Sequence, residues 1–182
     1  MARKAQIDRA SIHQAALFIA DADGLQAVTM KSIALRLEVT PMALYRWIGS
    51  KEALLDGLVE MILDELNQPL AATHWRDRLH ELIHSIRALS KSHPELFLLL
   101  MEHPQTSPAA ESVRDAIRAE LRHGGVPDSD LDHVGRVVTT VVIGASAAEG
   151  KGVLPSTTKE ALDAEFAEVE RMIDWLVDQH RS

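Results

Sequence analysis

The sequence contains no cysteine and few aromatic residues, and both absences narrow its chemistry. Without cysteine the chain can form neither disulfides nor thiolate metal sites. Aromatic residues make up 4% of the 182 residues, so a large flat ligand would find few stacking partners. Hydrophobic residues nevertheless amount to 46%, which is enough for a packed core and too many for a disordered chain.

Long apolar runs and segments of alternating polarity are also missing. The longest weakly polar run, residues 137–148, is far shorter than the ~20 residues of a membrane span. The first residues, MARKAQIDRASI, lack the apolar core of a secretory signal, so we expect a cytoplasmic protein without membrane association. Apolar residues recur with helical period almost throughout, and the sequence therefore predicts an all-α fold.

Turn and capping signals divide the chain into about nine predicted helices. A three-helix head, residues 1–51, precedes a helical body, residues 52–182, and a helix over about 51–66 connects them. The net charge of −8 is unevenly divided, because the head carries about +3 and the rest about −11. The predicted helices span residues 8–22, 30–37, 41–47, 51–66, 75–92, 94–102, 108–123, 128–149 and 158–181.

The segment TMKSIALRLEVTPMALYRWIGSKEAL, residues 29–54, is the most informative part of the sequence. It predicts two short helices about three residues apart, with Ile33, Leu37, Val39 and Leu44 placed to pack them together. A turn of that length between two such helices is typical of the helix-turn-helix, whose second helix enters the DNA major groove.

This segment resembles the DNA-binding core of the TetR family of transcriptional repressors. The matching patterns are T-x-x-x-I-A-x-x-L-x-V (residues 29–39), A-L-Y-R (43–46) and G-S-K-E-x-L (49–54). The helical body that follows also fits the family, so the resemblance covers essentially the whole chain. The resemblance implies a homodimeric repressor that needs no cofactor, binds a palindromic operator in double-stranded DNA and responds to a small-molecule effector.

The resemblance also implies contacts with the DNA backbone. Tyr45 matches the tyrosine whose hydroxyl meets a phosphate, and Lys51 matches a lysine that clamps another. Thr29, as the N-cap of the second helix, should offer its hydroxyl or its backbone N–H to a phosphate. Such contacts fix the position of the head and carry no sequence information.

Contacts with bases are expected from the start of the third helix. Met42 and Ala43 offer apolar contacts to thymine methyl groups, and Thr40 can form a hydrogen bond. Pro41 occupies the first helical position, where its missing N–H is tolerated. Lys31 can reach either a guanine edge or a phosphate.

Two positions of the head carry further expectations. Glu38 stands where the family usually has glycine, and a left-handed backbone there would cost a glutamate roughly 1–2 kcal/mol. Its carboxylate would also lie close to DNA. Trp47 is interpreted as part of the head core rather than as a DNA contact.

The body contains HELIH, residues 80–84, the spacing with which zinc proteases bind a metal. Projection at 100° per residue places His80, Glu81 and His84 roughly 125–170° from the apolar stripe of that helix. A catalytic zinc also needs a third protein ligand in a partly dry cleft. We therefore interpret the motif as a coincidence of spacing and expect neither catalytic nor metal-binding residues in the chain.

The last two predicted helices carry apolar stripes that suit pairing with a second copy of the chain as a four-helix bundle. Packing within one chain is the alternative reading of both stripes. The residues assigned to a dimer interface are Val134, Val138, Val141, Ala145, Ala148, Leu162, Phe166, Val169, Ile173 and Leu176.

The resemblance further implies a ligand cavity inside the body. Its candidate lining residues are Leu89, Phe97, Leu100, Met101, His103, Ile117, His133 and Val137. Two rivals to the repressor come from other classes of protein. They are a DNA-architectural protein without a ligand and, on the basis of HELIH, a metallopeptidase.

Overall fold

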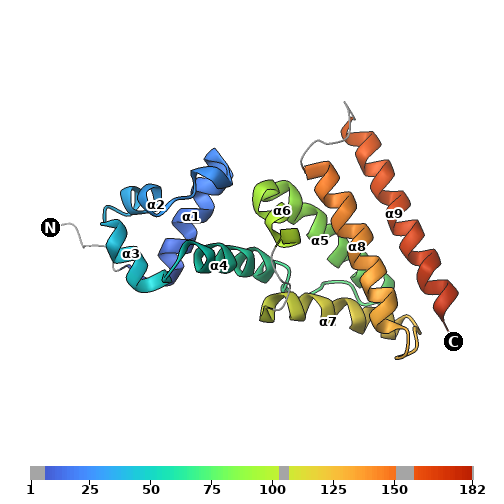
Figure 1. Ribbon diagram of the computed structural model, residues 1–182. Helices are drawn as coiled ribbons and strands as arrows, with labels where there is room; N and C mark the ends of the chain where they lie inside the picture. Colours follow the sequence, from blue (N-terminus) through green and yellow to red (C-terminus); the bar gives the residue numbers. More distant parts are fainter. Residues whose placement is uncertain (1–6, 103–106, 151–157, 182) are drawn as a thin grey trace. The chain divides into compact units, whose positions relative to one another are not determined.

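A computed structural model describes residues 7–102, 107–150 and 158–181, and the regular structure in these ranges is helical throughout (Figure 1). The all-α prediction is confirmed. None of these helices is long and apolar enough to cross a membrane. The elements are α1 (Arg9–Asp23), η1 (Leu25–Ala27), α2 (Met30–Arg36), α3 (Pro41–Ile48), α4 (Lys51–Asp64), α5 (Trp75–Ser92), α6 (Pro94–Glu102), α7 (Pro108–His123), α8 (Leu131–Gly150) and α9 (Lys159–His180).

Most helix boundaries agree with the sequence-based prediction because the signals are local. The bounds of α5, α6 and α7 coincide with the predicted ones. The eighth helix begins at Leu131 rather than at residue 128, because a turn precedes it in which Asp130 N donates to Pro127 O. The short 3-10 helix η1 was not predicted.

The chain forms two compact units, Met1–Ile62 with Glu95–Pro104, and Leu63–Pro94 with Gln105–Ser182. The first unit thus extends beyond residue 51, the predicted limit of the head. In it, α1, α2 and α3 contact one another around the fully buried Ile12, Ile33 and Leu44. Gly57 lets α4 lie close to α1, since a Cβ there would come within 2.2 Å of His13 Nε2.

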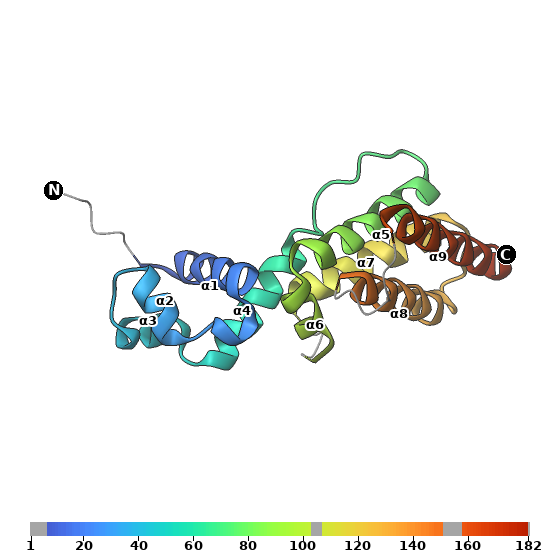
Figure 2. The ribbon, with the colours of Figure 1, turned by 90° about the horizontal axis from the view of Figure 1, so that it is seen from above.

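In the second unit, α5 lies against α7 and α8, and α8 also packs against α9. Figures 1 and 2 both show α8 and α9 side by side. The apolar stripe predicted for α5 is buried, Leu79 and Leu82 among it. Gly124, which follows α7, lies under the ring of Trp75, because a Cβ at that glycine would be 2.9 Å from the ring.

A ladder of opposite charges joins α5 to α9. Arg76 Nη1 lies 2.8 Å from Asp174 Oδ1, and its Nη2 donates to Asp178 Oδ1 at 3.1 Å. One turn later, His80 Nε2 lies 3.0 Å from the same Asp174 oxygen. His84 Nε2 lies 2.6 Å from Glu170 Oε1, at ion-pair distance but without hydrogen-bond alignment. The polar face of α5 therefore faces acidic side chains of α9.

The ladder ends in a buried cluster around Arg87. Its guanidinium donates to both carboxylate oxygens of Glu149, at 2.6 and 2.8 Å, and lies 2.8 Å from Asp163. Lys91 Nζ is 2.7 Å from Glu149 as well, and the Phe166 ring lies beneath the guanidinium. Arg87 and Glu149, which connect α5 to α8, are nearly inaccessible to water, whereas Asp163 of α9 and Lys91 lie at the exposed edge of the cluster.

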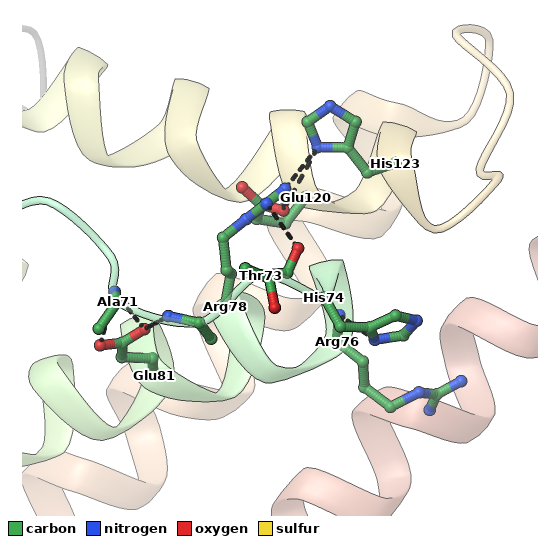
Figure 3. Close-up of polar contacts among 9 residues, drawn as sticks. Ala71, Thr73, His74, Arg76, Arg78, Glu81, Glu120 and His123 are labelled. Atoms are coloured by element: carbon green, nitrogen blue, oxygen red, sulfur yellow. Dashed lines mark hydrogen bonds and ion pairs between the residues drawn. The ribbon is translucent and has the colours of Figure 1, made fainter.

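Figure 3 shows a second set of polar contacts, at the start of α5. Arg78 donates to Thr73 O at 3.1 Å and to Glu120 on α7 at 2.5 Å, and its Nη2 also lies 3.0 Å from His123 Nδ1. The Glu81 carboxylate accepts the N–H groups of Ala71 and Ala72, and these bonds lower the pKa of Glu81. The segment before α5 is thereby fixed to the helix.

We expect Glu149→Gln to reduce the free energy of unfolding by about 3 kcal/mol, because it leaves the buried guanidinium of Arg87 short of a counter-charge. Burial would raise the pKa of Glu149, but hydrogen bonds from Arg87 and Lys91 outweigh it and lower that pKa. The carboxylate therefore stabilises the fold fully above about pH 4.5, and the stabilisation is lost as the pH falls through the lowered folded-state pKa.

Urea denaturation of both proteins at pH 7 and in acid measures this effect, and the difference between them should shrink in acid. The control is Asp128→Asn, which breaks the exposed pair with Arg122 and should cost less than about 1 kcal/mol. Equal losses from the two substitutions would contradict a special role for the buried cluster.

Candidate nucleic-acid interface

The first helix of the motif begins with a reciprocal cap. Thr29 Oγ1 accepts the Ser32 N–H at 3.0 Å, and Thr29 N donates back to Ser32 Oγ at 3.0 Å. Ser32 Oγ donates in turn to Ala27 O at 2.7 Å, which ties the cap to η1. The backbone N–H of Thr29 is therefore occupied. The Thr29 hydroxyl also donates to Ser32 Oγ at 3.0 Å, so both groups expected to reach a phosphate are engaged within the cap.

The turn between α2 and α3 is a Schellman motif with glutamate at its left-handed position. Glu38 has φ 55°, the one positive φ at a non-glycine residue in the described chain. Val39 N donates to Ala34 O at 2.9 Å and Glu38 N donates to Leu35 O at 3.3 Å, the bond pattern that closes a helix in this way. The left-handed conformation considered for Glu38 is present, and with it the strain.

The turn exposes the start of α3. Thr40 is the N-cap, but its side chain makes no capping hydrogen bond, and Pro41 occupies the first turn. Thr40 and Pro41 are exposed, Met42 is 73% exposed and Ala43 is half-buried. Leu44, the next residue, is fully buried and fixes the helix to the head. The tip thus offers a hydroxyl, an apolar side chain and the positive end of a helix dipole.

Two aromatic side chains lie exposed further along α3. Tyr45 and Trp47 are each 46% exposed. The interpretation of Trp47 as core was wrong, because the side chains of Leu44 and Ile48 already fill the buried face of this short helix. The end of α3 is held instead through its backbone, since Arg9 Nε donates to Trp47 O at 3.0 Å.

Positive charges flank this surface. Lys31, Arg46 and Lys51 are exposed, and Ser50 caps α4 by accepting the Ala53 N–H, which places Lys51 in the first turn. Arg36 stacks on Phe18, with its guanidinium 3.4 Å from the ring centroid. Sequence reasoning missed Leu35, which is 80% exposed and follows Lys31 by one helical turn. The spacing of four residues between Lys31 and Leu35 would have placed both on the same exposed face of α2.

The HELIH residues of α5 have structural partners. The histidines pair with Asp174 and Glu170 of α9, and Glu81 accepts backbone N–H groups. Within the described residues, no group of three or more histidine, aspartate or glutamate side chains could bind a metal ion. The face opposite the apolar stripe is covered by α9, and the motif serves helix packing.

The residues assigned to a ligand cavity fall in both compact units. Leu89 and Ile117 are buried in the second unit, whereas Phe97 and Leu100 are buried and belong to the first. The assignment of His133 and Val137 to the interior was wrong, since both line a shallow depression on the outer side of α8. The side chain of Met101 and residue His103 lie outside the described residues.

The dimer assignment requires a correction as well. Val134, Val138, Phe166 and Ile173 are buried within the chain itself, because the apolar stripes of α8 and α9 form its own core. The half-buried positions Val141, Ala145, Ala148, Leu162, Val169 and Leu176 lie nearer the surface. Met172 and Trp175, which sequence reasoning missed, are 53% and 62% exposed. They lie opposite the α9 core stripe, and a helical projection would have identified them.

A helix-turn-helix head followed by a helical body defines a class of DNA-binding proteins. The family model of the tetracyclin repressor-like C-terminal domain matches residues 68–174. The chain therefore belongs to the TetR family.

Known proteins of similar sequence or structure include the following three. The HTH-type transcriptional repressor DrrR1 of Streptomyces coeruleorubidus is 28% identical over 138 residues, which are 75% of this chain and 51% of that protein. The structure of ActR of Streptomyces coelicolor, solved with actinorhodin, matches with a TM-score of 0.80 at 22% identity. The match covers 98% of this chain and 100% of the ActR chain. The structure of BioQ, solved with its natural double-stranded DNA operator, matches with a TM-score of 0.75 at 25% identity. The match covers 97% of this chain and 99% of the BioQ chain. The chain spans about half the length of the curated relatives it matches.

We expect Glu38→Gly to raise the free energy of unfolding by about 0.5–1 kcal/mol, because relief of the left-handed strain exceeds the entropic cost of a glycine. Urea denaturation measures the change. Glu38→Ala keeps the Cβ and removes the charge, so it should bring little gain. An equal gain from alanine would assign the effect to the carboxylate instead of to the backbone.

Proposed function

We propose that this protein is a ligand-responsive homodimeric transcriptional repressor that binds a palindromic operator through the major groove. The observation that carries the proposal is the exposed tip of α3, residues 40–43, presented after a tight turn. A relative named as a repressor, one neighbour solved with operator DNA and another solved with a small molecule support it. The HELIH residues have packing roles, which favours a regulator over an enzyme.

In this proposal the head, residues 1–51, divides its contacts between phosphates and bases. Tyr45 and Lys51 bind the DNA backbone and set the position of α3, and Thr29 joins them when its hydroxyl turns from Ser32 Oγ to a phosphate. Thr40, Pro41, Met42 and Ala43 at the tip meet base edges, and the exposed Met42 is suited to thymine methyl groups. Lys31 extends from α2 to a guanine or a phosphate.

The body, residues 52–182, pairs two copies through α8 and α9. A groove of about 250 Å³ between these helices is lined by Val137, Val141, Met172, Trp175 and Leu176 among others, and its walls are almost entirely apolar. Next to it, Gly144 has no atom within 4 Å of the position of a Cβ, so a partner helix can approach closely. A two-fold pairing of this kind presents two α3 helices to successive major grooves about 34–36 Å apart.

Repression requires two states of the dimer that differ in the spacing of the heads. An effector that binds one state better shifts the population toward it by its difference in affinity. Release from the operator follows when the favoured state spaces the two α3 helices incorrectly for one face of the duplex. A DNA-architectural protein would lack this response to a small molecule.

We expect Lys51→Ala to weaken binding to operator and non-operator DNA alike, and to reduce the salt dependence of log K by about 0.9 for each phosphate that the protein no longer neutralises. Met42→Ala should instead change the preferred sequence, because it removes an apolar contact to bases. Fluorescence anisotropy on a panel of duplexes separates the two effects. Uniformly weaker binding from both substitutions would contradict the division between phosphate and base contacts.

We expect Trp175→Glu to convert the dimer to monomers at micromolar concentration, because it places a charge in the apolar groove between α8 and α9. Sedimentation equilibrium measures the mass, and circular dichroism reports whether the fold is kept. Leu35→Glu adds the same charge to an exposed leucine of the other unit and should leave the dimer intact. A folded Trp175→Glu dimer would remove this face from the proposal.

A further inference from the structure

A partly enclosed cleft of about 320 Å³ lies between α7 and α8, apart from the α8/α9 groove. Two residues one turn apart line it from α7, Arg114 and Arg118, and two more one turn apart line it from α8, Arg136 and Thr140. Three arginine side chains therefore line one hollow, together with the carboxylate residue Asp132. They belong to a part of the chain whose net charge is about −11, where most arginines are neutralised locally.

Arg118 and Arg136 differ in how their charge is balanced, and Arg114 has an interaction partner of its own. Arg118 donates to Asp115 at 2.7 Å and to Asp132 at 2.9 Å, so two carboxylates compensate it. Arg136 is exposed and takes part in no ion pair with any residue that the structure describes. An uncompensated guanidinium in a concave site with low-dielectric walls attracts an anion. Its planar fork suits a carboxylate, which it can bind through two parallel hydrogen bonds.

The rest of the cleft is suited to an apolar group. Its lining is largely apolar and includes the buried Ile117. Gly135 adds no side chain, and a Cβ there would still be 3.8 Å from Leu121 Cδ1 and 4.0 Å from Arg118 Cγ. Thr139 Oγ1 donates to Gly135 O at 2.8 Å and is occupied, whereas the exposed Thr140 hydroxyl lies beside Arg136 on the same helical face.

We propose that this cleft binds small organic carboxylates. The carboxylate is held by the Arg136 guanidinium and the Thr140 hydroxyl. The apolar part of the ligand lies over Ile117 in the space left by Gly135. A volume near 320 Å³ fits a ligand of one or two rings, at the lower end of ordinary small-molecule pockets.

Ligand binding in this cleft can also be coupled to the pairing of two copies through α8. This coupling rests on the proposed function. Arg136 and Thr140 line this cleft and also the shallow depression on the outer side of α8. Val137 and Val141 line the same depression. The latter two residues belong to the proposed dimer face. A carboxylate that draws α7 and α8 together therefore acts on the helix through which two copies pair.

Isothermal titration of the full-length protein with 2-naphthoate, 2-naphthylmethanol and inorganic phosphate tests the binding site. We expect 2-naphthoate to bind at least tenfold more tightly than the alcohol, and phosphate to compete poorly because it lacks the apolar part. Arg136→Gln should weaken naphthoate binding at least tenfold. Arg122→Gln removes an α7 arginine that does not line the cleft, and should leave the affinity unchanged.

Three results would overturn the proposal: equal affinity for naphthoate and the alcohol, full binding by Arg136→Gln, or an equal loss in both arginine variants. Gly135→Val fills the cleft without removing charge and should also abolish binding, with circular dichroism to confirm folding. Operator affinity is then measured with and without naphthoate. If naphthoate binds through Arg136 but operator affinity does not change, the site stands and the ligand response of the proposed function fails for this class of ligand.

Discussion

The buried guanidinium of Arg87 is the point on which the arrangement of the body depends. It joins α5 to Glu149 of α8 and to Asp163 of α9, and the Phe166 ring covers it. Taking an arginine out of water is unfavourable unless it is fully paired, so the three helices must meet in one relative position for the pairing to exist. Gly150 contributes to the same fit, since a Cβ there would come within 2.7 Å of Ser90 O.

Much of the fold could be predicted from the sequence because its signals are local. Caps, prolines and glycines mark the helix ends, and α5, α6 and α7 were predicted to the residue. The sequence left open whether Glu38 would adopt a left-handed backbone, and the structure shows that it does. The exposed tip of α3 followed from the helix-turn-helix motif, since Thr40 and Pro41 precede a single buried leucine.

The errors concern which neighbour a helical face meets, and no local signal contains that information. An apolar stripe has the same sequence pattern whether it packs within one chain or between two chains. Val134 and Ile173 were therefore assigned to an interface, although they form the core of the chain. The sequence placed the HELIH residues away from the apolar stripe of α5 but did not identify their partners, because the complementary acids of α9 lie about 90 residues away in the sequence. Trp47 was interpreted as core from its residue type, although the buried face of α3 has room only for Leu44 and Ile48.

The chain contains three tryptophans, and the structure gives each a different environment. Trp47 lies half exposed on α3, Trp175 lies exposed on α9, and Trp75 is packed over Gly124 with the Arg76 guanidinium 4.8 Å from its ring centre. Indole emission depends on the polarity around the ring. Variants that keep one tryptophan at a time would therefore report optically, without an added dye, on the head, on the outer surface of α9 and on the half-buried start of α5.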